Sequence, residues 1–221
     1  MSFGDKKLSE IAISVPGSTS LLREYDLDFC CGGSDTLANA AAEKGLNLAE
    51  IETRLTELQN SKAENPEEYW VNATYPEIID HILVRYHQRH REQLQELIVL
   101  ADRVESVHGD REDCPIGVAA ELRNVYEDLS NHMMKEEHVL FPMIKAGNYM
   151  MAQMPIRMME MEHAEHGEHL DVLKSLTNNM TPPADACNTW RALYSGIQEF
   201  ADDLMMHIHR ENNILFPRVI A

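Results

Sequence analysis

The sequence predicts an all-α protein whose larger part is a bundle of four long helices. Apolar residues recur at steps of three or four through four long segments, which is the spacing of one helix face. Hydrophobic residues make up 44% of the 221 residues, whereas aromatic residues make up only 6%. The 13 methionines suit helix packing better than a sandwich or a barrel.

The first part of the chain, residues 1–58, is expected to form a small module of short helices. Pro16-Gly17 breaks a first helical turn. Ser34-Asp35 is placed to cap an alanine-rich helix, and Gly45 ends that helix. Residues 48–58 carry the pattern of a last amphipathic helix.

Residues 59–74 are interpreted as a linker, because they contain Pro66 with asparagine and acidic residues and show little periodicity. The bundle domain is expected over residues 75–221. Its predicted helices cover 75–106, 116–146, 155–178 and 184–219. The joints are marked by Gly109 with Pro115, by Gly147 with Pro155, and by Asn178, Asn179 and Pro182-Pro183.

The predicted bundle contains two pairs of repeated phrases. Residues 132–142 are HMMKEEHVLFP, and residues 207–217 are HIHRENNILFP. A shorter phrase precedes each of them, HQRHREQL at 87–94 and HAEHGEHL at 163–170. The bundle is therefore a tandem duplication in which each half supplies two helices.

The repeated polar residues lie within the apolar stripes of these helices. His132 and Glu136 are one helical turn apart and share a face, and the second half repeats this spacing with His207 and Glu211. A buried carboxylate without a partner costs several kcal/mol, and the stripes contain no Lys or Arg. A bound cation is the simplest compensation, and helical bundles hold metals in this way.

The number of candidate ligands indicates two metals. Four imidazoles and two carboxylates exceed the four ligands of a structural zinc. Two metals that each take two histidines, with both glutamates bridging, would use every ligand. The mixed nitrogen and oxygen donors suit iron, with manganese or zinc as alternatives. The spacing alone does not decide between His87 and His90, or between His163 and His166.

These motifs resemble a known family. The order His87, His132-x-x-x-Glu136, His163, His207-x-x-x-Glu211 is similar to that of hemerythrin-like (HHE) domains, which are four-helix bundles. The amino-terminal DFCCGG stretch resembles the cysteine-bearing module of bacterial repair-of-iron-centres proteins, also called di-iron iron–sulfur cluster repair proteins. The resemblance covers essentially the full chain.

The resemblance implies an oxo- and carboxylate-bridged centre of two iron ions. Its ligands would be His87, His132, Glu136, His163, His207 and Glu211, with both glutamates bridging. His90 and His166 then become packing residues or partners of the ligands. The other histidines, His81, His108, His138, His169 and His209, are assigned to the surface. Asp128 is expected to orient His132, and Glu162 to line an access path, unless each is a solvated surface group.

The function implied is repair of iron–sulfur clusters damaged by nitrosative or oxidative stress, by holding and delivering labile iron. Cys30 and Cys31 are expected to act in metal handling or thiol redox chemistry, whereas Cys114 and Cys187 are expected to be thiols without partners. The alternatives are a di-iron nitric oxide reductase and a reversible sensor of O2 or NO. Damaged cluster proteins and small ligands such as NO or O2 are the expected partners, and the chain is expected to be a monomer or homodimer.

Composition argues against several other classes. The chain has 19 basic and 37 acidic side chains, and the formal net charge of −18 would repel nucleic acid. No stretch nears the ~20 apolar residues of a membrane helix, and the amino terminus lacks the apolar core of a signal peptide. The 4 cysteines do not form a secretory disulfide framework. We therefore expect a cytoplasmic protein without nucleic-acid or membrane partners.

Overall fold

The computed structural model describes residues 2–61 and 63–221, and these residues form helices joined by short turns. The predicted all-α class is confirmed. Within the described residues the β-type pairing is confined to an isolated bridge between Lys7 and Thr36. Contacts divide the chain into two units, one of residues 1–78 with 208–221 and one of residues 79–207. No described helix is long and apolar enough to cross a membrane.

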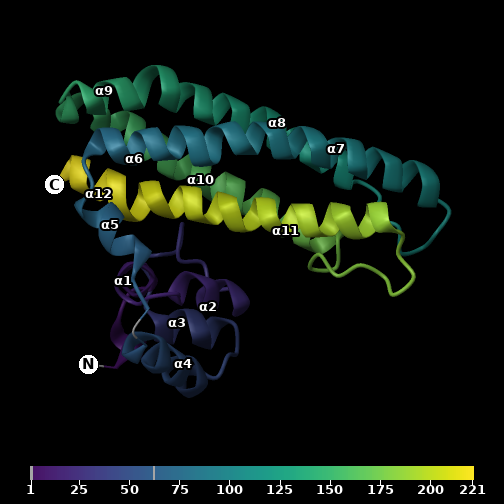
Figure 1. The fold of residues 1–221 in the computed structure, drawn as a ribbon, viewed down its shortest axis with the longest axis horizontal. Helices are drawn as coiled ribbons and strands as arrows, with labels where there is room; N and C mark the ends of the chain where they lie inside the picture. Colours follow the sequence, from purple (N-terminus) through teal and green to yellow (C-terminus); the bar gives the residue numbers. More distant parts are fainter. Residues whose placement is uncertain (1, 62) are drawn as a thin grey trace. The chain divides into compact units, whose positions relative to one another are not determined.

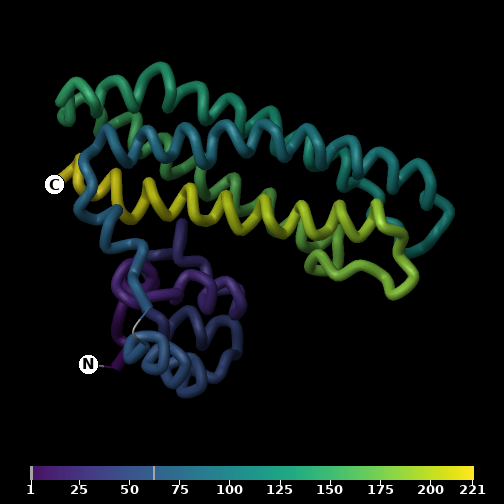
Figure 2. Tube along the Cα trace, in the orientation of Figure 1, coloured from purple at the N-terminus to yellow at the C-terminus, as the bar shows by residue number. Residues whose placement is uncertain are grey.

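Four long helical rods form the bundle (Figure 1). The first rod joins α6 (Tyr75–His81), the π-helical turn η2 (Ile82–His87) and α7 (Gln88–His108). The second joins α8 (Val118–Lys135), the π-helical turn η3 (Glu136–Leu140) and α9 (Phe141–Lys145). The third is α10 (Tyr149–Leu176), and the fourth joins α11 (Asn188–His209), η4 (Arg210–Leu215, also π-helical) and α12 (Phe216–Ile220). The Cα trace runs through each π turn without a break (Figure 2).

The core of the bundle is formed by the apolar stripes that the sequence predicts. Leucines and other apolar residues from all four rods are almost completely buried. Among them are Leu94 and Leu97, Leu122, Val125 and Leu129, Leu170 and Leu173, and Leu193, Ile197, Phe200 and Leu204.

The third rod begins earlier than predicted. Gly147 makes the turn with a φ of 76°, which glycine adopts without steric cost. Helix α10 then starts at Tyr149, so Pro155 lies inside the helix instead of before it. A proline there removes one backbone donor within the first two turns, which a helix of 28 residues tolerates.

The amino-terminal segment contains η1 (Phe3–Asp5, a 3-10 turn), α1 (Leu8–Ser14), α2 (Ser18–Glu24), α3 (Leu37–Glu43) and α4 (Leu48–Asn60). The cap of α3 is Thr36, because its hydroxyl accepts a hydrogen bond from the Asn39 amide; the expected cap Ser34-Asp35 was wrong. Gly45 follows α3 with a φ of 64°, as its predicted role requires.

The interval that we interpreted as a linker also contains a helix, α5 (Pro66–Asn72). Asn65 caps this helix through its side chain, Pro66 occupies the first turn, and Glu67 and Glu68 add negative charge near the amino terminus. These are the sequence features of a helix start. Lys62 of the same interval, like Met1, lies outside the described residues.

Candidate metal centre

The three π-helical turns lie where candidate ligands occur. His87 is the last residue of η2, Glu136 is the first residue of η3, and Glu211 is the second residue of η4. A π turn adds one residue to a helical turn and therefore changes the face on which the following side chains project. Such turns are frequent at functional sites.

The repeated Leu-Phe-Pro phrase accompanies two of these π turns. The backbone N–H of Phe141 donates to the carbonyl of Glu136, and that of Phe216 donates to the carbonyl of Glu211, each five residues back. The next residues, Pro142 and Pro217, have no N–H with which to continue an α-helical ladder. The duplicated phrase thus builds the same irregular turn around each glutamate.

The structure brings all six predicted ligands together in two overlapping groups. One group is His87, Glu136, His207 and Glu211, and the other is His132, Glu136, His163 and Glu211. The ligand atoms within each group all lie within 4.8 Å of one another, and every member is buried. Each histidine belongs to one group, whereas both glutamates belong to both. This sharing is the arrangement that two cations with bridging carboxylates require.

The ring nitrogens converge on the Glu136 carboxylate. Its Oε2 lies 3.3 Å from His87 Nε2 and 3.4 Å from His132 Nε2. The Nε2 atoms of His132 and His163 face each other at 3.2 Å. Two imidazole nitrogens at this separation need a proton or a cation near them, so the donor set fits a metal with mixed nitrogen and oxygen ligands.

Two outer carboxylates hold the opposite sides of these rings. Glu137 Oε1 lies 2.8 Å from His87 Nδ1, and Glu162 Oε2 lies 3.0 Å from His132 Nδ1. Hydrogen bonding to His87 lowers the pKa of Glu137 to about 2, and Arg91 assists. Hydrogen bonding to His132 likewise lowers the pKa of Glu162 to about 2. A carboxylate at Nδ1 favours the tautomer whose Nε2 lone pair faces the centre.

Sequence reasoning missed Glu137 and placed Asp128 wrongly. Glu137 directly follows the candidate ligand Glu136, and that adjacency was the only hint of its role. Asp128 lies 3.1 Å from His169 Nε2 with an exposed side chain, so it does not orient His132. Glu162 contacts the ring of His132 instead of simply lining an access path.

The remaining histidines depart in part from their predicted surface positions. His209 is fully buried and packs edge-on against Phe29, with ring centroids 5.3 Å apart, so its assignment to the surface was wrong. His169 is half-buried between two carboxylates. His138 is exposed, and His81 and His108 are partly so. His108 Nε2 lies 3.3 Å from Cys187 Sγ, so Cys187 does have a partner.

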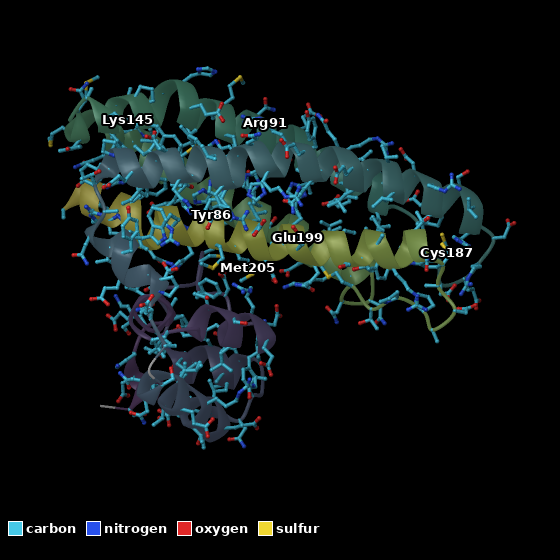
Figure 3. The ribbon with its side chains drawn as sticks, in the orientation of Figure 1. Tyr86, Arg91, Lys145, Cys187, Glu199 and Met205 are labelled. Carbon is cyan, nitrogen blue, oxygen red and sulfur yellow. The ribbon has the colours of Figure 1, made fainter. Side chains whose placement is uncertain are left out.

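His207 lies against an aromatic residue instead of an outer carboxylate. Tyr86, labelled in Figure 3, stacks on the His207 ring with centroids 5.3 Å apart and an interplanar angle of 12°. Burial lowers the pKa of His207 well below its usual value, and the neighbouring His87 adds to the shift. The ring is therefore neutral at physiological pH, which is the form that binds metals.

Asp28 organises the turn that carries the two predicted functional cysteines. Its carboxylate accepts hydrogen bonds from the amides of Cys30, Cys31 and Gly32 at 3.0, 2.9 and 2.9 Å. The Cys30 thiol lies 3.2 Å from the same carboxylate and 3.9 Å from Cys31 Sγ. Gly33 is required next, because a Cβ there would lie 2.6 Å from the Phe29 carbonyl oxygen.

The cysteine turn is hydrogen-bonded to the helix that carries Glu211. Asn212 Nδ2 donates to the Cys30 carbonyl at 3.0 Å, and Asn213 Nδ2 donates to the Phe29 carbonyl at 2.8 Å. Cys30 is buried, whereas Cys31 is partly exposed. The hydrogen bond between the two thiols, together with burial, raises the pKa of Cys30 well above its usual value. The three side chains Asp28, Cys30 and Cys31 could hold a metal ion.

Comparison with known proteins agrees with this geometry. Residues 78–219 match the hemerythrin HHE cation binding domain, and residues 4–59 match a domain of unknown function, DUF542. A probable iron-sulfur cluster repair protein of Haemophilus influenzae is 68% identical over 220 residues, which cover 100% of this chain and 99% of the relative. The chain belongs to this family of HHE-domain repair proteins.

Other members of the HHE-domain repair family are similar over the same extent. The iron-sulfur cluster repair proteins of Musicola paradisiaca and Citrobacter koseri are 55% and 54% identical, with 100% of this chain and 98% and 99% of the relatives covered. The HHE match contains all six candidate ligands, and the DUF542 match contains Cys30 and Cys31. A cation-binding site in this chain therefore follows from both the family and the convergence of buried donors.

Proposed function

We propose that this protein holds two iron ions at the six-residue centre and restores iron–sulfur clusters damaged by nitrosative or oxidative stress in other proteins. The observation that carries the proposal is the sharing of Glu136 and Glu211 between two pairs of histidines. The relatives' names, which refer to iron–sulfur cluster repair, support the same role at 54–68% identity.

The six side chains would divide into terminal and bridging ligands. His87 with His207 would bind one iron, and His132 with His163 the other, while the two glutamates would join them. Mixed imidazole and carboxylate ligation suits iron. Bound iron would supply exchangeable coordination positions and redox chemistry. Glu137 and Glu162 would hold the rings of His87 and His132 in place. All six candidate ligands are buried, which keeps bulk water away from them.

The cysteine turn would handle iron or thiol redox equivalents during repair. Cys31 is the more exposed thiol and would meet a partner protein first, whereas the raised pKa of Cys30 keeps its thiol protonated until a cation lies near it. None of the four cysteines is in a disulfide within the described residues, and a reducing compartment such as the cytoplasm maintains that state.

The proposal is tested by metal counting and a repair assay. Protein purified anaerobically and loaded with ferrous iron should bind two irons per chain with magnetically coupled Mössbauer spectra. The loaded protein should restore activity to a cluster-depleted dehydratase, and Glu136→Leu with Glu211→Leu should abolish both binding and repair. Glu160→Gln, a charge change at an exposed position of α10, serves as the control. Unimpaired repair by the double variant would overturn the proposal.

A further inference from the structure

Helix α10 carries a row of exposed methionines along one side of its first half. This row, the methionine stripe, consists of Met150, Met151, Met154, Met158 and Met161. These residues are 82%, 66%, 79%, 51% and 63% exposed, respectively. A helix has 3.6 residues per turn, so their side chains project within an arc of about 100° and extend over about 16 Å of the helix. They therefore form one continuous apolar surface.

The opposite side of α10 faces the bundle core. Ile156 and Met159 are 1% and 3% exposed, and the candidate ligand His163 is fully buried. The spacing places these residues roughly 150° around the helix from the methionine stripe. The stripe is therefore part of neither the core nor the candidate metal centre, and packing within the bundle does not explain it.

The size of the methionine stripe is that of an interaction surface. Single exposed apolar residues are normal on soluble proteins, whereas contiguous apolar patches of roughly 300–600 Å² are often functional. Five methionines at these exposures present on the order of 500 Å², which is more than half of the ~800 Å² that each partner buries in a standard interface. Methionine is unbranched and polarizable, and it is common at binding surfaces. An area of this size supports a reversible association.

A second copy of this chain matches the methionine stripe in shape. A row of side chains along a helix forms a ridge, and ridges of one helix pack into the grooves of another. Two identical stripes become complementary when a twofold axis relates them and their helices are antiparallel. In that arrangement the axis passes between Pro155 and Ile156, and Met150 lies opposite Met161 of the second copy.

The charges beside the methionine stripe favour this antiparallel arrangement. Glu165 and Glu168 continue the same side of α10 beyond the stripe and are exposed. Parallel packing would bring these carboxylates beside their own copies, and like charges in an interface are unfavourable. Antiparallel packing brings them near the amino terminus of the other α10, where Asn148 makes no side-chain capping hydrogen bond. A helix amino terminus attracts negative charge.

We propose that two copies of this chain associate through their methionine stripes, with the two α10 helices antiparallel. A second copy provides an apolar surface of the same length and brings its carboxylates to the helix amino terminus. The proposal is independent of the proposed function, because the candidate ligands of each copy all belong to one chain and project from the other side of α10.

Sedimentation velocity of the full-length protein across a dilution series tests the association. The wild type should shift from the monomer mass toward twice that mass as concentration rises. Met154→Glu with Met158→Glu should raise the dimer dissociation constant by at least about tenfold, because it places charges in an apolar interface. Met154→Leu with Met158→Leu conserves volume and should leave the constant within about threefold.

The matched control is Val99→Glu with Val107→Glu, which adds the same two charges on α7 at positions that are 67% and 63% exposed. It should dimerise like the wild type. A wild type that stays monomeric at every concentration, or equal weakening in the control, would overturn the proposal. Circular dichroism checks that each variant folds, and the leucine variant tests the stripe without added charge.

A second pair of variants tests the orientation. Glu165→Gln with Glu168→Gln should weaken an antiparallel dimer but strengthen a parallel one. Glu92→Gln with Glu96→Gln, at exposed positions of α7, corrects for the lower net charge. A stronger dimer after this correction would overturn the antiparallel arrangement.

The same measurement distinguishes a second copy from a client protein. The probe is the cluster-depleted dehydratase of the repair assay, added to the wild type and to Met154→Glu with Met158→Glu. Sedimentation of the wild-type monomer with the dehydratase, lost in the variant, would assign the methionine stripe to a client protein and overturn the proposed dimer.

Discussion

Replacement of Glu162 by glutamine should selectively weaken one metal position. The Glu162 carboxylate lies 3.0 Å from His132 Nδ1 and also binds the Lys135 ammonium at 2.5 Å. An amide can still accept a hydrogen bond from the ring but carries no charge. The ring then donates less electron density through Nε2, and Lys135 is left with an unbalanced positive charge near a cation site.

The expected loss of affinity follows from this contact. Removing an outer partner of a metal-bound histidine typically weakens metal binding by about 10–100-fold, or roughly 1.4–2.8 kcal/mol. Because Lys135 is left without its carboxylate partner, the loss of metal affinity in Glu162→Gln should lie toward the upper end of this range. Glu137→Gln should weaken the His87–His207 position in the same way, because Arg91 also binds that carboxylate, at 2.7 Å.

Stepwise competition with a chelator, under anaerobic conditions, would measure the two affinities separately. Each single variant should lower one affinity and leave the other within about threefold, since the two outer carboxylates contact histidines of different groups. Glu160→Gln is the matched control, as it removes an exposed charge from α10. Wild-type affinity in Glu162→Gln, or an equal loss in Glu160→Gln, would refute the role of the outer carboxylates.

Three further predictions concern stability. Glu67→Gln should lower the free energy of unfolding, measured by urea denaturation, by about 3 kcal/mol, because it leaves the buried Arg210 without its anionic partner. Glu68→Gln, on the exposed side of α5, is the control and should change this free energy little. Gly167→Ala should raise the melting temperature, because alanine gains up to ~1 kcal/mol in helix propensity and its Cβ meets nothing. Gly33→Ala should instead lower the free energy of unfolding by about 1–3 kcal/mol, because its Cβ meets the Phe29 carbonyl oxygen. The reverse order of the two melting temperatures would contradict both assignments. The raised pKa of His169 means that its ion pairs stabilise the metal-free fold fully below the usual pKa of ~6.5 and lose this effect as pH rises through the folded pKa. The stability difference between wild type and His169→Gln should therefore shrink from pH 6 to pH 9, and a difference that grows with pH would show that the sign is wrong.

The candidate ligands could be found in the sequence because duplication and helical spacing act together. His132 with Glu136, and His207 with Glu211, had to share a helix face, and the repeat indicated that the two faces belong to one site. Carboxylates within apolar stripes that contain no Lys or Arg then indicated a cation. The overlapping ligand groups, with both glutamates in each, agree with this reasoning.

The partners of those ligands could not be predicted in the same way. Glu137 contacts a histidine that precedes it by fifty positions, and Glu162 contacts one on another helix. Such contacts depend on helix rotation, which the π turns alter and which periodicity does not specify. His209 was misplaced for a related reason, because Phe29 of the amino-terminal segment and Glu67 of α5 cover it.

The two halves of the duplication differ at the residue that directly follows each glutamate of the candidate centre. At the position after the bridging glutamate, the first half has Glu137, which holds the His87 ring, and the second half has Asn212, which holds the Cys30 carbonyl. A carboxylate could not donate that hydrogen bond, so the amide at this position attaches the cysteine turn, whereas the carboxylate in the first half supports a candidate ligand. The repeat therefore keeps the candidate ligands in both halves, whereas the adjacent position makes a different contact in each half.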